Sequence, residues 1–368
     1  MTWRGDARQL ATPFAVPARR QPLPPSGIRN TAEFARPVGL ARTTVSRVLN
    51  GQPGLDPRTI ERVQRALAET GFAPNAHAMH LKGKRTATIG ICMEDLATPT
   101  AVSKLAMLQR VLRARGFASL IEVLPPGAGR EVVRHFLSLR VEAVVFIGHF
   151  VPEEIEARIA ELGANGTPHL VIDHLGLRGA NTVSLDRAAG MVAVMEHLLD
   201  LGHRSFALLG LSKGPVSRHD RMRGVRAALE ARGLDADACT VVPDYLHERR
   251  NDFDYGRNLA RSVLARAARP TAYVGYNDEI AIGALRALQE AGVRVPRDAS
   301  VTGFNHQEIS RMTVPSVTTI DQNIETTVTT AADWLLGQLG QPLRSRPFVR
   351  TIPPRLVVGE STGPARSG

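Results

Sequence analysis

The polar residues between Thr43 and Asn50 are the part of this chain best suited to contact a nucleic acid. Threonine, serine, arginine and asparagine fill most positions of this octet, and their side chains can reach base edges and phosphates in the DNA major groove. Val45, Val48 and Leu49 recur at helical spacing and would give the helix one apolar face. The octet predicts the second helix of a helix-turn-helix, although an ordinary amphipathic surface helix has the same pattern.

The elements that would position this helix form a small headpiece. A first helix is expected from about Thr31, as its N-cap, to Arg36, followed by a tight turn at residues 38–40. A third helix should begin after Asp56, a capping residue followed by proline at the first helical position, and should end at Gly71. Residues 1–30 are rich in Pro and Arg and are interpreted as a disordered basic extension, or as sequence upstream of a misplaced start codon.

The charge of the chain is concentrated in its first part. Residues 1–85 contain fourteen basic and five acidic residues, so that +9 of the formal net charge of +11 lies there. A basic end on a nearly neutral body is typical of a nucleic-acid-binding module joined to another domain. A solvated charged surface would give a smaller bias.

Several other classes of protein and site lack support in the sequence. The two cysteines, Cys92 and Cys239, exclude a disulfide framework and a cysteine-built zinc site, and His77 and His80 have no third metal ligand nearby. No apolar run approaches the roughly 20 residues that span a bilayer. Walker A, nucleophile-elbow and dinucleotide-binding motifs are absent from the sequence. We therefore expect a cytoplasmic protein that is not an enzyme and needs no cofactor or metal.

From residue 86 onward, predicted strands and helices alternate. Such alternation, over this length, predicts two parallel sheets covered by helices. The expected strands are 87–93, 118–123, 143–147, 169–172, 205–210, 240–243, 272–275 and 300–304. The expected helices are 103–115, 130–139, 152–162, 187–201, 219–232, 254–266 and 278–291. The stretch after Gly340 holds several prolines and no heptads, so no tetramerising coiled coil is expected.

These motifs together resemble transcriptional repressors of the lac repressor/gal repressor family, from about Thr31 to Gly363. Segments 44–51 (TVSRVLNG) and 71–75 (GFAPN), at their mutual spacing, are highly specific for this family. Weaker matches follow at 89–91, 197–204, 277–278, 294–296 and 303–304.

The resemblance implies DNA-contacting roles in the headpiece. Arg42 and Thr43 stand where the family's base-reading pair stands, and an arginine there suits the O6/N7 edge of guanine. Ala41 departs from the Ser or Thr that the family prefers as the cap of this helix, which costs on the order of 1 kcal/mol. The headpiece residues implied to contact DNA are Arg42, Thr43, Thr44, Ser46, Arg47 and Asn50.

The resemblance also implies a hinge helix after the headpiece, which would fold on the operator and pack against its copy from a second subunit. Asn75, Ala78 and Leu81 match the family's hinge, and Leu81 would be the wedge inserted into a central minor-groove step. Without the resemblance, Leu81 would be an ordinary linker hydrophobe.

The larger part of the chain resembles a periplasmic-binding-protein-like module of two doubly wound lobes around an effector cleft. Ligands of such sheets bind beyond the carboxyl ends of the strands. Thr100 stands where the family often has an aromatic residue, and residues 303–306 lack the family's usual acidic pair. The residues implied to bind the effector, or alternatively to form structural ion pairs, are Asp95, Asp173, His174, Arg221, Asp278 and Gln322.

The predicted organisation follows from these segments. It comprises an extension (1–30), an all-α helix-turn-helix headpiece (31–73), a hinge (74–85), a two-lobed α/β effector-binding and dimerisation domain (86–358) and a tail (359–368). We expect a homodimeric regulator, most simply a repressor, that binds a pseudopalindromic double-stranded operator and is switched by a small molecule such as a sugar or sugar derivative. A corepressor would use the same parts. The alternative is a solute-binding sensor without operator function.

Overall fold

The computed structural model describes residues 28, 30–49, 52–72, 85–124, 129–174, 176–212, 216–244, 251–267, 269–344 and 346–366. The chain divides into two compact units, with the boundary after Thr86. Within the described ranges, no helix combines the length and the apolar character that a membrane span requires. The same ranges contain no group of His, Cys, Asp and Glu side chains placed to hold a metal ion.

The headpiece contains α1 (Thr31–Val38), α2 (Arg42–Leu49) and α3 (Pro57–Thr70). Each helix contributes apolar side chains to one small core, in which Val45 of α2 and Val63 of α3 are fully buried. The rings of Phe34 and Phe72 stack with centroids 4.8 Å apart, and Phe72 thereby ties the chain after α3 back to α1. Val48 and Leu49 pack against the same core, as the helical spacing predicted.

The helix ends of the headpiece correct two predictions and confirm a third. The N-cap of α1 is Asn30, not Thr31: the Asn30 side chain accepts hydrogen bonds from the backbone N–H groups of Ala32 and Glu33, both at 3.0 Å. Asp56 caps α3 by accepting from the Arg58 N–H at 3.0 Å. Helix α1 runs to Val38, two residues beyond the predicted end, with Pro37 inside its last turn, and ends at Gly39, whose φ of 66° is left-handed.

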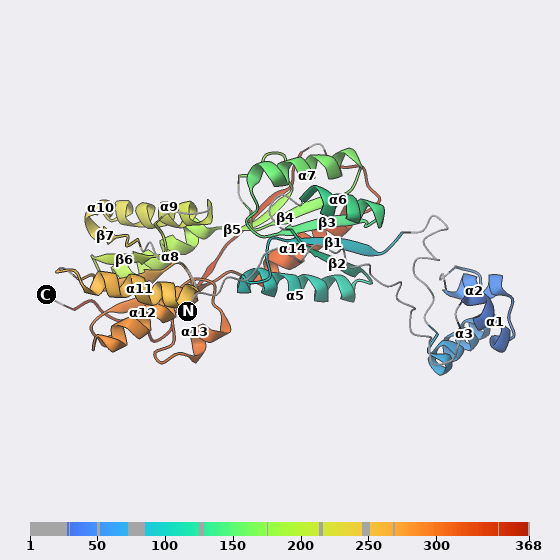
Figure 1. Cartoon of the computed structure of the whole chain (residues 1–368), viewed down its shortest axis with the longest axis horizontal. Coiled ribbons are helices and arrows are strands. Elements are labelled where there is room, and N and C mark those ends of the chain that lie inside the picture. The colour runs from blue at the N-terminus through green and yellow to red at the C-terminus, as the bar shows by residue number, and fades with distance from the viewer. Residues whose placement is uncertain are drawn as a thin grey trace, which may run out of the picture. The chain divides into compact units, whose positions relative to one another are not determined.

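The first lobe of the larger unit is a six-stranded parallel sheet covered by helices on both faces (Figure 1). In spatial order its strands are β11 (Val349–Ile352), β5 (Thr182–Leu185), β4 (His169–Ile172), β3 (Ala143–Ile147), β1 (Thr88–Met93) and β2 (Ala118–Val123). Helices α5 (Pro99–Ala114) and α14 (Ile324–Gly337) pack on one face; α6 (Gly129–Ser138) and α7 (Pro152–Ala164) pack on the other. Alternate strand residues serve the two cores: Ile91 packs toward α5, and Cys92 packs toward α6.

The second lobe has a four-stranded parallel sheet in the order β7-β6-β8-β9. These strands are β6 (Phe206–Leu209), β7 (Thr240–Val241), β8 (Ala272–Gly275) and β9 (Ser300–Thr302). Helices α8 (Arg187–Asp200) and α9 (Val216–Ala231) cover one face, and α11 (Asp252–Leu264) and α12 (Asp278–Glu290) cover the other. The short helices are α10 (Ala236–Cys239) and α13 (Glu308–Met312), and β10 (Thr319–Asp321) pairs antiparallel with β12 (Arg355–Val357). Two doubly wound lobes, as predicted from the alternation, are confirmed.

The chain passes between the two lobes three times. It leaves the first lobe after β5 to enter α8, returns from β10 into α14, and leaves again between β11 and β12. The lobes are thus joined at residues 185–187, 321–324 and 352–355. Such connections let two compact lobes change their relative orientation through a few backbone torsions.

Candidate functional site

Helix α2 presents its polar residues away from the headpiece core. Val45 is fully buried, which fixes the rotation of the helix about its axis. Arg42, Thr43 and Arg47 are exposed, and the Arg47 Nε donates to the Gln52 side chain at 3.2 Å. Thr44 and Ser46, the other headpiece residues expected to contact DNA, are partly exposed. The predicted DNA-contacting residues of α2 that the structure describes are therefore all at least partly accessible, on the side of the helix away from Val45.

The remaining predicted DNA contacts lie outside the described residues: Asn50, Asn75, Ala78 and Leu81. Their roles stay predictions. At the start of α2, Ala41 offers no side-chain acceptor to the first backbone N–H groups of the helix, and its carbonyl accepts from the Val45 N–H at 3.1 Å.

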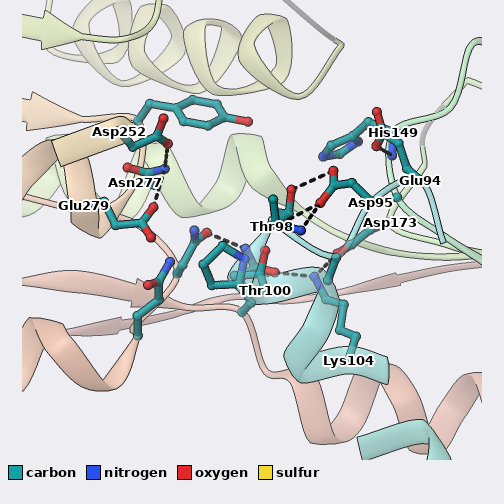
Figure 2. A pocket seen from close by; sticks show the side chains of 18 of the residues that line it. Glu94, Asp95, Thr98, Thr100, Lys104, His149, Asp173, Asp252, Asn277 and Glu279 are labelled. Carbon is teal, nitrogen blue, oxygen red and sulfur yellow. Dashed lines mark hydrogen bonds and ion pairs between the residues drawn. The ribbon is translucent and has the colours of Figure 1, made fainter. Parts of the chain in front are cut away.

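The second candidate site is a cavity of about 530 Å³ in the larger unit, within the range of small-molecule pockets. Residues of both lobes line it. Its first-lobe wall follows the carboxyl ends of β1, β3 and β4, and its second-lobe wall includes residues at the start of α11 and α12. Figure 2 shows Asp252, Asn277 and Glu279 on one side of the pocket, with Glu94, Asp95 and His149 on the other. The cavity therefore lies where open parallel sheets bind ligands.

A buried ionic network forms part of the wall. The ammonium of Lys104, on α5, contacts the Asp173 carboxylate just after β4, and it also donates to Gln322 Oε1 at 2.7 Å. Arg187, at the start of α8, lies 3.3 Å from the other oxygen of Asp173. Burial alone would raise the pKa of Asp173, but the two cations hold it well below its usual range. Asp173 is consequently a carboxylate at neutral pH.

Arg221, on α9, is held between two aromatic rings. Its guanidinium carbon lies 4.2 Å from the centroid of the Tyr276 ring and 4.1 Å from that of Phe304. One Nη donates to the Ser217 carbonyl at 3.2 Å, and the buried Nε has no hydrogen-bond partner among the described residues. Burial lowers the pKa of Arg221 to about 10, so the side chain stays cationic at neutral pH. Such ring contacts stabilise a cation without neutralising it.

Four of the six predicted effector residues line the cavity: Asp95, Asp173, Arg221 and Gln322. His174 and Asp278 do not, which corrects their predicted placement. The buried His174 Nε2 lies 2.8 Å from the Phe150 carbonyl oxygen, on the other side of the strand end. Asp278 is fully buried, and its carboxylate accepts from Thr319 Oγ1 and from the Gln307 N–H at 2.7 Å.

The residues on either side of Asp278 in the sequence occupy the position in the cavity that was predicted for Asp278 itself. Asn277 caps α12 by accepting from the Ile280 N–H at 2.9 Å, and Asn277 and Glu279 both line the cavity. The Asp278 side chain instead packs against the backbone of Gly303, where a Cβ would lie 2.3 Å from an Asp278 carboxylate oxygen. Asp278 therefore stabilises the loop after β9 rather than contacting a ligand in the cavity.

Sequence reasoning missed the buried cations. Lys104 falls on the apolar face of α5 with Ala101, Leu105 and Leu108, and a charge among such residues was a usable signal. Arg187 follows β5, a strand that was not predicted, so its position at a strand end was not visible. The other lining residues that were missed include Glu94, Thr98, Thr100, His149, Arg218, Asn251, Asp252, Tyr276, Asn277, Glu279, Asn305 and Gln307.

A helix-turn-helix headpiece followed by a two-lobed, ligand-cleft domain defines a class of DNA-binding regulators. Residues 32–75 match the family described as bacterial regulatory proteins, lacI family, and residues 195–362 match the periplasmic binding protein-like domain. The lactose operon repressor of Escherichia coli (strain K12) is 30% identical over 324 residues, which cover 87% of this chain and 86% of the repressor. The chain belongs to the lacI family and is a DNA-binding transcriptional regulator.

Two further similarities agree. The transcriptional regulator DegA of Bacillus subtilis (strain 168) is 27% identical over 336 residues, covering 90% of this chain and 97% of DegA. The crystal structure of the lac repressor dimer bound to operator and the anti-inducer ONPF has a TM-score of 0.77 at 26% identity, and covers 91% of this chain and 99% of that one.

Proposed function

We propose that this protein is a homodimeric repressor whose affinity for a pseudopalindromic operator is switched by a polyhydroxylated small molecule, such as a sugar or sugar derivative. The observation that carries the proposal is the polar cleft: carboxylates, amides and guanidinium groups from both lobes line one cavity. Hydroxyl groups both donate and accept hydrogen bonds, so a polyol can satisfy donors and acceptors together.

The headpiece supplies sequence selectivity in this proposal. Arg42 and Thr43 read base edges, and Thr44, Ser46, Arg47 and Asn50 complete the contacts and fix the register on the duplex. Asn75 and Ala78 belong to the hinge helix, and Leu81 inserts into the minor groove at the centre of the operator. Two-fold symmetry of the dimer places one headpiece on each half-site.

The cleft supplies the switch. A ligand that bridges the lobes favours one lobe orientation by its differential affinity for the two orientations. The hinge segment precedes β1 directly, so a change in the first lobes of a dimer reaches the paired hinges without an intervening domain. Operator affinity then changes by the same coupling free energy that links the two sites.

The relatives of this chain are transcriptional regulators, and its first domain matches a family of bacterial regulatory proteins. We propose that the protein is not an enzyme, acts in the cytoplasm and binds no cofactor. The alternative is a ligand-binding sensor without an operator.

Selection of random double-stranded DNA on the full-length protein tests the proposal. The expected result is an enriched palindromic site that the protein binds with strong salt dependence, and that a member of a sugar and polyol panel releases or tightens. Ligand binding without any enriched site would favour the sensor; enrichment of a site that no panel member affects would remove the sugar switch.

A further inference from the structure

The innermost part of the cleft carries an excess of positive charge. Lys104, Arg187 and Arg221 are each 3% exposed, and among the described residues the carboxylate that pairs with them is Asp173, which contacts only the first two. His149, which faces the same network, is neutral, because burial lowers its pKa to about 3. Three basic side chains thus share one carboxylate.

Arg221 is the cation without a carboxylate partner among the described residues. Its neighbour in sequence, Asp220, is buried but pairs with Arg223 at 3.0 Å, and so does not neutralise it. Buried charges in proteins are normally paired, because desolvation of an isolated ion is costly. The two rings cover Arg221, and Tyr276 and Asp173 raise its pKa, but no carboxylate among the described residues pairs with it. Its Nε–H is buried between its neighbours, so a ligand in the cavity would meet the Nη groups; a planar guanidinium without a carboxylate partner is suited to a carboxylate or phosphate.

The acidic groups of the cleft lie elsewhere. Asp252 and Glu279 receive hydrogen bonds from Asn277 on the second-lobe wall, while Glu94 and Asp95 accept backbone N–H groups on the first-lobe wall (Figure 2). Carboxylates there accept hydrogen bonds from hydroxyl groups and repel an anion. The cleft is therefore polarised, with cations together on its inner side and acceptors on its two walls.

We propose that the effector carries one anionic group, as a monosaccharide acid or a monosaccharide phosphate does. The anionic group binds Arg221, beside Lys104 and Arg187, and the hydroxyl groups of the same molecule face the acidic walls. This inference rests on the proposed function, since it names the chemical class that the regulatory cleft selects.

Matched pairs of ligands test the inference on the full-length protein. Calorimetric titrations compare D-glucose with D-glucuronate, D-gluconate and D-glucose 6-phosphate, and D-galactose with D-galacturonate, D-galactonate and D-galactose 6-phosphate. We expect at least one charged member to bind about tenfold or more tightly than its neutral parent, the scale of a hydrogen bond to a charged group. The acid and phosphate arms identify the anionic group. Neutral sugars that bind equally well or better would overturn the inference, and so would a panel in which no charged member binds.

Variants locate the anionic group. Arg221→Gln should reduce the ratio of the affinities for the best charged ligand and its neutral parent at least tenfold, whereas Arg221→Lys should retain part of the preference. Arg226→Gln is the matched control, because Arg226 lies on the same helix and pairs with Asp237 at the surface. If Arg221→Gln and the control behaved alike in a folded protein, the assignment to Arg221 would be wrong. Operator binding, measured in the same samples without ligand, reports separately on the proposed function.

Discussion

Lys104 donates a hydrogen bond to Gln322 at 2.7 Å, and this contact links α5 to the segment through which the chain re-enters the first lobe. The Gln322 amide nitrogen donates in turn to Asn305, which follows β9 of the second lobe. A chain of three side chains therefore runs from one lobe to the other along the cleft. A ligand that contacts this chain contacts both lobes and one of their connections.

Replacing Lys104 should destabilise the larger unit. Lys104→Met leaves Asp173 buried with Arg187 as its partner, so we expect a loss of roughly 3 kcal/mol, near the lower limit for breaking a buried pair. Urea unfolding of the full-length protein measures it. Lys104→Met combined with Asp173→Asn should cost less than the sum of the two single changes. Additive losses would show that the pair is not energetically coupled.

Arg42→Ala should relax sequence preference at one position of each half-site. The loss of a bidentate contact to guanine is worth about 1–3 kcal/mol against the correct base and little against the others. Fluorescence anisotropy on single-base operator variants measures it. Arg65→Ala is a suitable control, because Arg65 is exposed on α3 and pairs with Glu61. A uniform loss over all sequences would make Arg42 a phosphate contact.

Leu81→Ala should separate specific from non-specific binding. A wedge that kinks the operator contributes only where the DNA can be bent, so specific affinity should fall by more than the affinity for random DNA. Binding to operator and to random duplex at equal salt provides the comparison. Equal losses on both would remove the wedge role.

An N-cap side chain at position 41 should stabilise the start of α2, the helix proposed to contact DNA bases. Ala41→Ser supplies the missing side-chain acceptor and should gain about 1 kcal/mol locally. Hydrogen exchange of the α2 amides in the full-length protein would report the gain as roughly fivefold slower exchange. Ala41→Val, which adds no acceptor and is as poor an N-cap as alanine, is the control and should bring no comparable protection. Unchanged exchange in Ala41→Ser would mean that the first N–H groups are already satisfied.

Asp278 should make stability depend on pH. Burial raises its pKa to about 7, above that of the unfolded chain, so the folded state binds more protons than the unfolded state between about pH 4 and pH 7. Its stabilising contribution is complete below pH 4 and is lost as the pH rises through 7. Thermal unfolding at pH 5 and pH 7.5 should therefore differ less in Asp278→Asn than in the parent. An equal pH dependence in both proteins would contradict the assignment.

The predictions that succeeded rest on local chemistry. Asp56 followed by proline, and Gly71 with its left-handed φ of 62°, determine the ends of α3 without help from the rest of the fold. The N-cap of α1 was missed by one residue because Asn30 and Thr31 are both good caps, and only the backbone geometry distinguishes them. Periodicity likewise found most strands of both sheets.

The elements that were missed depend on long-range pairing. Strands β5 and β11 are four residues each and pair with one another across more than 160 residues of sequence, which no local pattern reports. Without β5, Arg187 could not be placed at a strand end facing the cleft, whereas Gln322 was placed there by the resemblance. Position at the end of a strand predicts which segment faces the cleft, but it does not tell which of three consecutive side chains points into it. Asp278 was therefore chosen where Asn277 and Glu279 line the cavity.

The last strands of the chain also delay the completion of both lobes during synthesis. Strands β1 to β5 leave the ribosome first, but α14, which covers one face of their sheet together with α5, and the edge strand β11 emerge only after the whole sheet of the second lobe. The second lobe in turn lacks β12, which pairs with β10, and residues 361–363, which hydrogen-bond to Ser300 and Val301, until the end of the chain emerges. Domains fold as the chain emerges, so both lobes reach their full set of contacts only when the C-terminal segment has been made.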